Sequence, residues 1–228
     1  MQNVQEMKAQ GVPVFRGLAR PVLVSSVFFM VVTGIAYPLA TTGVAQLLFH
    51  RQAQGSLVER GGHMVGSSVI GQDFTKPEYF HPRPSVTTGP DPKDASKTVN
   101  QPYNAASSGA SNLGPLSKTL IDQVTARAAA YRKDNGLAPN APVPVDAVTA
   151  SASGLDPDIS VANAKLQIER VAKARGVSAD QISPLLAQQT SQRQLGVLGD
   201  PRVNVLQLNL ALDASIKAQP TAAQPAAR

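Results

Sequence analysis

Cysteine is absent from this chain of 228 residues, and only three histidines occur, at His50, His63 and His81. The absence of cysteine excludes disulfide bonds, thiolate metal ligands and a cysteine nucleophile, and three scattered histidines argue against a histidine-rich metal centre. Aromatic residues make up 4% of the chain, and its basic residues, which give a net charge of +6, are dispersed. A surface that stacks nucleic-acid bases needs aromatic and basic side chains together. We therefore expect no nucleic-acid partner and no metal site.

Catalytic signatures are missing as well. The sequence has no nucleophile elbow, Walker A, HExxH or EF-hand pattern, although each of these places its chemistry at a fixed spacing. The small residues around Ser151 and Ser153 are typical of a tight turn rather than of a catalytic triad. Asp156 and Asp158 could bind a hard cation, but two carboxylates in a turn more often mark the entry to a helix. We expect no catalytic residues in this chain.

Charge is absent from residues 21–49, which read PVLVSSVFFMVVTGIAYPLATTGVAQLLF. Because about 20 apolar residues suffice to cross a bilayer as a helix, we predict a membrane-spanning helix over residues 20–49. A signal peptide is the alternative, but its apolar core is about 7–15 residues long, much shorter than this run. Gly34 and Gly43 would allow close contact with a neighbouring membrane helix.

The charges before this span predict its orientation. Residues 1–20 carry three basic side chains and one acidic side chain, and short cytoplasmic segments hold the excess of Lys and Arg. We expect residues 1–19 to form a short cytoplasmic arm and residues 50–217 an extracytoplasmic, periplasmic domain. The Ala-, Pro- and Gln-rich residues 218–228 are predicted to be a disordered tail. The chain would then cross the cell inner (plasma) membrane once.

The part after the span is predicted to be a single mixed α+β domain. A period of two residues between turn signals indicates strands, and a period of three to four indicates helices. Ser160 and the Ser178–Gln181 capping box mark two helix starts, and frequent proline over residues 72–115 predicts a long loop. The predicted strands cover residues 56–60, 63–71, 143–149 and 203–210, and the predicted helices cover residues 115–135, 161–175 and 178–190.

Two groups of side chains leave two interpretations open. Residues 74–85 hold three of the ten Phe and Tyr residues, and aromatic residues in such a loop either dock on a partner or pack against their own domain. Arg170, Lys173 and Arg175 form either a solvated helix face or a contact with acidic groups.

Six blocks of sequence stand out when they are read in order: Gly71–Phe74, Tyr79–Ser85, Ser107–Leu113, Val143–Pro157, Gln167–Gly176 and Arg202–Asp213. Together they resemble the KdpC family, one of the subunits of the Kdp potassium-transporting ATPase. The resemblance runs from about residue 20 to residue 213, and its order of parts, one N-terminal span and then one outer domain, also agrees.

This resemblance implies a non-catalytic accessory subunit of an ATP-driven potassium importer. Its implied partners are the lipid bilayer, the channel-like subunit KdpA, the P-type ATPase subunit KdpB, which hydrolyses ATP, and the small subunit KdpF. Potassium would be the transported ion, and the outer domain would sit over the outer side of KdpA. A membrane-anchored periplasmic enzyme or solute-binding domain is the alternative from another functional class.

The family also implies a role as a catalytic chaperone that raises the ATP affinity of KdpB, through a Ser-Gly motif similar to the ABC-transporter signature. Here Ala110 stands where a second glycine would help backbone approach, and the predicted orientation places the motif away from cytoplasmic ATP. The nucleotide-binding residues implied by the motif are Ser107, Ser108, Gly109 and Ser111. The residues expected at subunit interfaces are Phe80, Arg83, Ser85, Asn112, Gly34 and Gly43.

Overall fold

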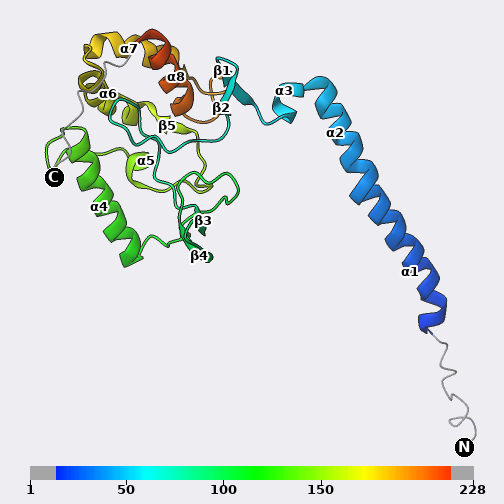
Figure 1. Ribbon diagram of the computed structural model, residues 1–228. Coiled ribbons are helices and arrows are strands. Elements are labelled where there is room, and N and C mark those ends of the chain that lie inside the picture. The colour runs from blue at the N-terminus through cyan, green and yellow to red at the C-terminus, as the bar shows by residue number, and fades with distance from the viewer. Residues whose placement is uncertain (1–13, 217–228) are drawn as a thin grey trace, which may run out of the picture. The chain divides into compact units, whose positions relative to one another are not determined.

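The computed structural model describes residues 14–216, and the chain divides into two compact units, residues 1–56 and 57–228. The first unit is helical and the second is a mixed domain of helices and small antiparallel sheets (Figure 1). The predicted class, one apolar N-terminal helix followed by an α+β domain, is therefore confirmed. Most of the predicted cytoplasmic arm and all of the predicted tail lie outside the described residues.

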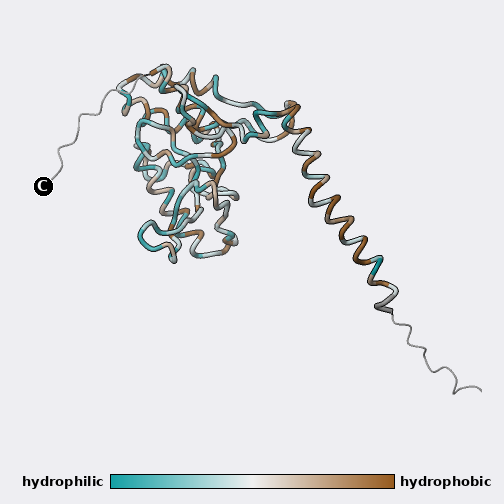
Figure 2. Tube along the Cα trace, turned by 45° about the vertical axis from the view of Figure 1, so that its right-hand side comes forward, coloured by the Kyte–Doolittle hydropathy of each residue, from teal (hydrophilic) through white to brown (hydrophobic). Residues whose placement is uncertain are grey.

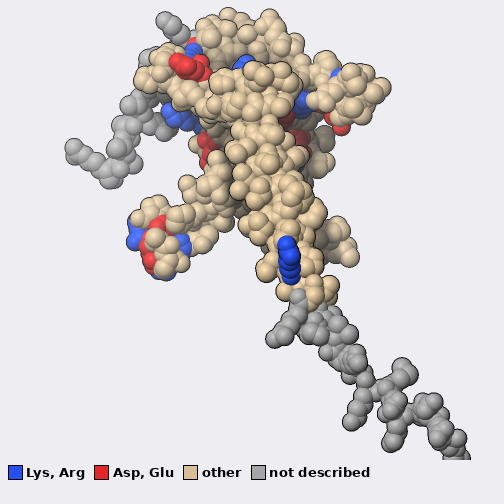
Figure 3. Space-filling view, turned by 90° about the vertical axis from the view of Figure 1, so that its right-hand side faces the viewer, with Lys and Arg blue, Asp and Glu red and all other residues tan. Residues whose placement is uncertain are grey.

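The first unit is one long apolar helix with a short helix after it. Helix α1 covers Val14–Val31, a π-helical turn η1 covers Val32–Ala36, α2 covers Tyr37–Leu48, and α3 covers His50–Ala53. Residues 17–48 form a candidate membrane span of 32 residues, none of them buried inside the protein. Such a helix is about 48 Å long, which exceeds the bilayer's apolar core of about 30 Å. Figure 2 shows its predominantly apolar colouring, and Figure 3 a surface almost free of charge.

Hydroxyl groups in this helix bond to its own backbone, as a polar side chain in an apolar medium must. Thr33 donates to the carbonyl of Phe29 at 2.6 Å, and Thr41 donates to that of Tyr37 at 2.9 Å. The π turn includes Gly34, and single π turns within helices occur frequently at functional sites. Within the described residues the helix begins at Val14, six residues before the predicted boundary of the span.

The second unit holds three small antiparallel sheets. Strands β1 (Leu57–Arg60) and β2 (His63–Ser67) form the hairpin expected from the sequence. Strands β3 (Thr88–Asp91) and β4 (Asp94–Asn100) form a second hairpin. The third sheet has the order β5-β7-β6, with β5 at Asp158–Ser160, β6 at Thr190–Ser191 and β7 at Arg202–Asn204.

Helices α6 (Val161–Arg175), α7 (Ala179–Gln188) and α8 (Val205–Ser215) pack around the apolar core (Figure 1). Helices α4 (Lys118–Asp134) and α5 (Val145–Val148) contact each other beside them. The core includes Phe80, Ile159, Ala164, Ile168, Val171, Ile182, Leu186, Val203, Val205, Leu208 and Leu212.

The predicted signals at the ends of α6 and α7 are confirmed. Ser160 accepts a hydrogen bond from the backbone N–H of Asn163 at 3.0 Å, and Gly176 ends α6 in the left-handed conformation with φ 68°. Both hydrogen bonds of the Ser178–Gln181 capping box are present. Local side-chain chemistry therefore sets these helix ends.

The structure corrects the prediction of a strand over residues 203–210. Only Arg202–Asn204 is extended, and α8 begins at Val205, where the Asn204 side chain accepts from the N–H of Gln207 at 3.0 Å. The alternating leucines suggested a period of two. The spacing of Val205, Leu208 and Leu212, all buried, is that of a helix face, and packing against the core selects it.

Two further predictions differ from the structure. Residues 145–148 form the short helix α5 rather than an extended stretch. The proline-rich loop over residues 72–115 contains the β3–β4 hairpin, in which Pro90 is tolerated because each strand of an isolated two-stranded sheet is an edge strand. Helix α4 begins at Lys118 rather than at residue 115, with Ser117 as its N-cap.

Candidate functional site

Residues 77–81, called here the clamped segment, lie beside α6 and α8, and the segment begins in a turn in which the N–H of Tyr79 donates to the carbonyl of Lys76 at 3.1 Å. Each of their five successive carbonyl groups accepts a hydrogen bond from a side chain of one of these helices. No strand pairs with the segment in the described residues. Since buried carbonyl groups need partners, four side chains of α6 and α8 perform the task that a neighbouring strand would perform in a sheet.

Two amide side chains hold the peptide groups of Phe80 and His81 on both sides. The N–H of Phe80 donates to Asn209 Oδ1 at 2.8 Å, and Asn209 Nδ2 donates back to the Phe80 carbonyl at 3.0 Å. Gln167 repeats this arrangement at His81, with distances of 2.7 and 3.1 Å. Both amides are 1% exposed. Their burial is tolerable only because each donor and acceptor is paired.

Two arginines hold the preceding carbonyl groups. Arg170 Nη1 donates to Pro77 O at 2.6 Å and to Tyr79 O at 2.9 Å. The backbone carbonyl of Glu78 accepts from Arg175 Nε at 2.7 Å.

Arg175 is 1% exposed and carries a buried charge. Its guanidinium pairs with the carboxylate of Asp213 at 2.8 Å, donates to the carbonyl of Ile216 at 2.9 Å, and lies 5.1 Å from the centre of the Tyr79 ring. Such a charge is stable in a protein interior only with this full set of partners. The interpretation of the three basic residues of α6 as a solvated face is therefore wrong for Arg175, which contacts an acidic group.

A second polar cluster, the loop junction, joins residues 83–87, 101–109 and 151–156. Ser85 Oγ donates to Gly154 O at 2.7 Å, and the N–H of Ser151 donates to Pro84 O at 3.1 Å. Gly154 has φ 69°, and a Cβ there would lie 2.4 Å from Thr87 Cγ2. No larger residue fits this position without displacing a loop.

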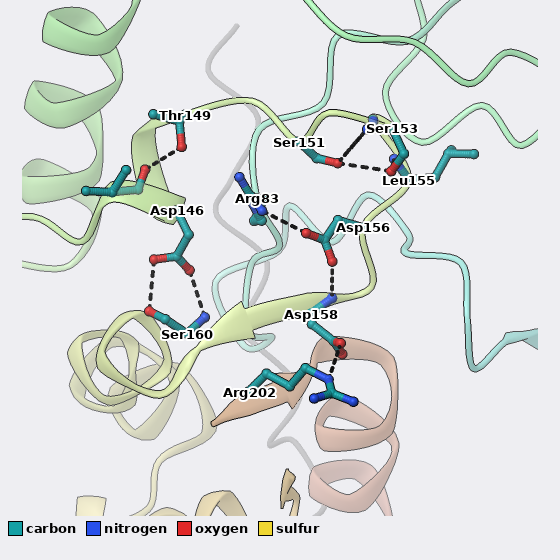
Figure 4. Close-up of polar contacts among 12 residues, drawn as sticks. Arg83, Asp146, Thr149, Ser151, Ser153, Leu155, Asp156, Asp158, Ser160 and Arg202 are labelled. Carbon is teal, nitrogen blue, oxygen red and sulfur yellow. Dashed lines mark hydrogen bonds and ion pairs between the residues drawn. The ribbon is translucent and has the colours of Figure 1, made fainter. Parts of the chain in front are cut away.

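The carboxylates of the Val143–Pro157 block and β5 are paired, as Figure 4 shows. Asp156 points to Arg83 at 2.8 Å, and Asp158 points to Arg202 at 3.0 Å. Asp146 accepts from both the N–H and the hydroxyl of Ser160, each at 2.8 Å. Within residues 14–216 no cluster of three metal-ligating side chains occurs. The two aspartates thus form ion pairs, of which Asp156 with Arg83 joins two loops and Asp158 with Arg202 joins strands β5 and β7.

The expected interface residues of the aromatic loop lie in different environments. Phe80 is fully buried in the core, so of the two interpretations of this aromatic, packing against its own domain is the one that the structure shows. Arg83 is half-buried in its ion pair with Asp156, and Ser85 belongs to the loop junction. Asn112, by contrast, is exposed, with φ 50°.

The glycines expected at a helix interface lie in the apolar helix of the first unit. A Cβ added at Gly34 or at Gly43 would have no neighbour within 4 Å in the described residues. Both backbones are therefore open to a helix from another chain.

Residues 107–109 of the Ser107–Ser111 motif are part of the loop junction and contact its residue Ser153. The N–H of Gly109 and the hydroxyl of Ser108 both donate to the carbonyl of Ser153, at 2.9 and 3.0 Å. A phosphate-binding loop directs such donors at its ligand, usually from a helix N-terminus. Here the next helix, α4, begins only at Lys118.

The sequence did not indicate that the side chains of Gln167 and Asn209 hold the clamped segment. Gln167 belongs to a matching block, but nothing in the sequence marks it as buried. A signal is present in α6, where Ala164, Ile168, Val171 and Arg175 share one face at spacings of three and four. A polar residue placed on or beside an apolar face is a candidate for a buried hydrogen-bonding role.

A family model described as "KdpC: K+-transporting ATPase, c chain" matches residues 19–214. A Rhodopseudomonas palustris (strain TIE-1) protein named potassium-transporting ATPase KdpC subunit is 59% identical over 196 residues, covering 86% of this chain and 96% of the relative. Proteins of the same name from Methylobacterium nodulans and Bradyrhizobium diazoefficiens are 57% and 55% identical over 194 residues, covering 85% of this chain and 95% of each relative.

A candidate membrane-spanning helix, followed by a domain whose polar clusters fasten its own loops, defines a protein with an apolar N-terminal helix and an α+β domain. The family match covers both parts of it. The chain belongs to the KdpC family, whose members are subunits of the potassium-transporting Kdp ATPase complex.

Replacing Asn209 by leucine tests the clamped segment. We expect Asn209→Leu to lower the free energy of unfolding by about 2–4 kcal/mol, because it leaves the buried N–H and carbonyl of Phe80 without partners. Gln207→Leu, an exposed position on the same helix, should change it by less than about 0.5 kcal/mol. Urea unfolding of the full chain in detergent measures both. Equal effects of the two variants would contradict the role of Asn209.

His81 predicts a pH dependence of stability. Burial lowers the pKa of His81, and the nearby charge of Arg170 lowers it further. The folded protein therefore binds this proton less readily than the unfolded chain, so the contribution of His81 to stability should decline as the pH falls through about 6.5. We expect His81→Gln to flatten the fall of the urea midpoint between about pH 7.5 and about pH 5.5. His63→Gln, at an exposed position, should leave that slope unchanged, and a flat wild-type profile would refute the assignment.

Proposed function

We propose that this chain is the non-catalytic subunit that assembles and stabilises the Kdp complex, with KdpA, KdpB and KdpF as its partners. Membership of the KdpC family is the observation that carries the proposal. The described side chains support it, since the buried arginine, the amides and the three aspartates discussed above are all used to hold loops in place. ATP hydrolysis then belongs to KdpB, and this chain turns over no substrate.

The apolar helix supports a single anchor in the inner membrane, with the N-terminus cytoplasmic and the α+β domain outside. In this proposal Gly34 and Gly43 face membrane helices of the partner subunits, because small residues such as glycine allow two helix backbones to approach closely. The exposed residue Asn112 and the adjoining loop would contribute to subunit contacts outside the membrane.

The proposed catalytic-chaperone role acts through assembly rather than through nucleotide bound to this chain. The Ser108 hydroxyl and the Gly109 N–H are bonded to Ser153, and both groups would have to leave that carbonyl to hold a phosphate. A subunit that stabilises one conformation of KdpB raises its ATP affinity without touching ATP, as linkage requires.

Side-specific labelling tests the orientation. A cysteine introduced by Ser107→Cys would be the only thiol of the chain. We expect a membrane-impermeant maleimide to label it from outside the inner membrane, in spheroplasts, without lysis. Gln2→Cys, at the opposite end of the span, should be labelled only after the membrane is opened. The reverse pattern would exclude the proposed orientation.

Nucleotide titration separates the two forms of the chaperone role. We expect the isolated full chain to give no binding heat with ATP, while its addition to KdpB raises the ATP affinity of KdpB. Ser108→Ala should raise that affinity as much as the wild type does. ATP binding by the chain alone that is lost in Ser108→Ala would instead establish a direct nucleotide contact.

A further inference from the structure

An apolar hollow of about 460 Å³ lies between α6 and α7, on the side of the domain where β6 begins. Its walls include Val161 and Ile168 from α6 and Leu186 and Ala187 from α7. Thr190, the first residue of β6, closes one end. Two packed helices therefore form most of the wall of the hollow, and Gln192, in the loop after β6, also lines it.

The chain that leaves this hollow forms an exposed apolar turn over residues 193–200. Leu195 is 90% exposed, Val197 72% and Leu198 57%. Strand β6, before the turn, pairs with β7, after it, so the turn projects from the same small sheet that borders the hollow. We call the hollow and the turn together the α6–α7 surface.

The turn is held rigidly in a conformation that its residues do not favour. The N–H and carbonyl of Gln194 bond to those of Leu198, both at 2.9 Å, and Arg193 pairs with Asp200 at 2.7 Å. Leu195 has φ 52°, a left-handed conformation that costs a branched side chain free energy. Exposing leucine to water at a strained position is doubly unfavourable in the isolated domain. Strain of this kind is retained where it serves a function.

Charge identifies what the α6–α7 surface could bind. Lys165 lines the hollow and also a second apolar hollow of about 500 Å³ beside Pro142–Pro144. It pairs with no carboxylate of residues 14–216. An occupant that fits is apolar and carries a carboxylate that can reach Lys165.

A polypeptide fits this surface better than a lipid or a second copy of the chain. Segments that lie in a membrane surface carry Trp, Tyr and several cationic side chains, whereas the turn has no aromatic residue and its arginine is already paired. Two copies joined face to face would bring their Lys165 side chains toward each other, and like charges oppose that contact.

We propose that the α6–α7 surface docks an apolar, carboxylate-bearing segment of another subunit of the potassium-transporting ATPase. Leu195 enters the partner, the partner's apolar side chains fill the hollow, and its carboxylate pairs with Lys165. The inference rests on the proposed function, because it needs the chain to be assembled with other subunits.

Photo-crosslinking in the intact complex tests the contact. Leu195 is replaced by p-benzoylphenylalanine in the full-length chain, and Leu116, which is 93% exposed, is replaced in the same way as a control. We expect illumination to join position 195, and not position 116, to another ATPase subunit, with the crosslinked peptide containing Asp or Glu. An adduct with phospholipid, an adduct with a second copy, or no adduct from a complex that co-purifies would each overturn the proposal.

Two substitutions test the proposed apolar contact of Leu195 and the proposed ion pair of Lys165. Asparagine tolerates the left-handed conformation, so Leu195→Asn should keep or raise the unfolding temperature of the chain while weakening its retention in the complex about tenfold, as expected for the loss of one buried anchor. Lys165→Glu should weaken retention similarly, whereas the exposed control Lys97→Glu should not. Unchanged retention in both variants would refute the surface.

Co-purification of the wild-type chain distinguishes failure of the proposed function from failure of the docking surface alone. If it fails to co-purify with any ATPase subunit, the proposed function fails, and the docking surface fails with it. If it co-purifies but position 195 gives no crosslink to a subunit, only the docking surface is wrong.

Discussion

Backbone hydrogen bonding of the clamped segment is the constraint on which the domain depends. Five successive carbonyl groups, from Pro77 to His81, are satisfied by side chains rather than by a strand. Because a buried peptide without partners is costly, the segment can enter the core only where α6 and α8 supply these groups. Phe80, the fourth residue of the segment, then packs among the residues of both helices.

This arrangement explains why a small domain with little sheet holds long loops in fixed positions. The three sheets are short, and isolated hairpins of this kind are only marginally stable. Polar side chains replace the missing sheet contacts, with Arg175 joining α6, the clamped segment and Asp213 of α8. The Arg83–Asp156 pair extends the same device to the loop junction. These polar side chains fix loops in place, which agrees with the proposed role of an assembly subunit.

The two units differ in how they expose apolar side chains, and this difference agrees with their proposed roles. The N-terminal helix exposes its apolar side chains along its whole length, which is stable in a lipid environment. The α+β domain buries one apolar core but leaves several large apolar side chains exposed, and three of these, Leu195, Val197 and Leu198, lie together in one turn. Exposed apolar side chains that lie together are a candidate contact with another protein, which agrees with the proposed docking surface.

The sequence by itself determined features that depend on neighbouring residues. The uncharged run predicted the apolar helix, and Ser160, Gly176 and the Ser178–Gln181 box predicted the ends of α6 and α7, because caps act within one turn. Family blocks indicated the KdpC family before any fold was known. Tertiary structure alone decided the rest. Residues 205–210 are helical because a helix places Val205 and Leu208 on one face, which is buried in the core. Phe80 is buried because its peptide groups form hydrogen bonds with Asn209, which is far along the chain. No local pattern contains such a partner, since burial and pairing arise only when distant segments meet.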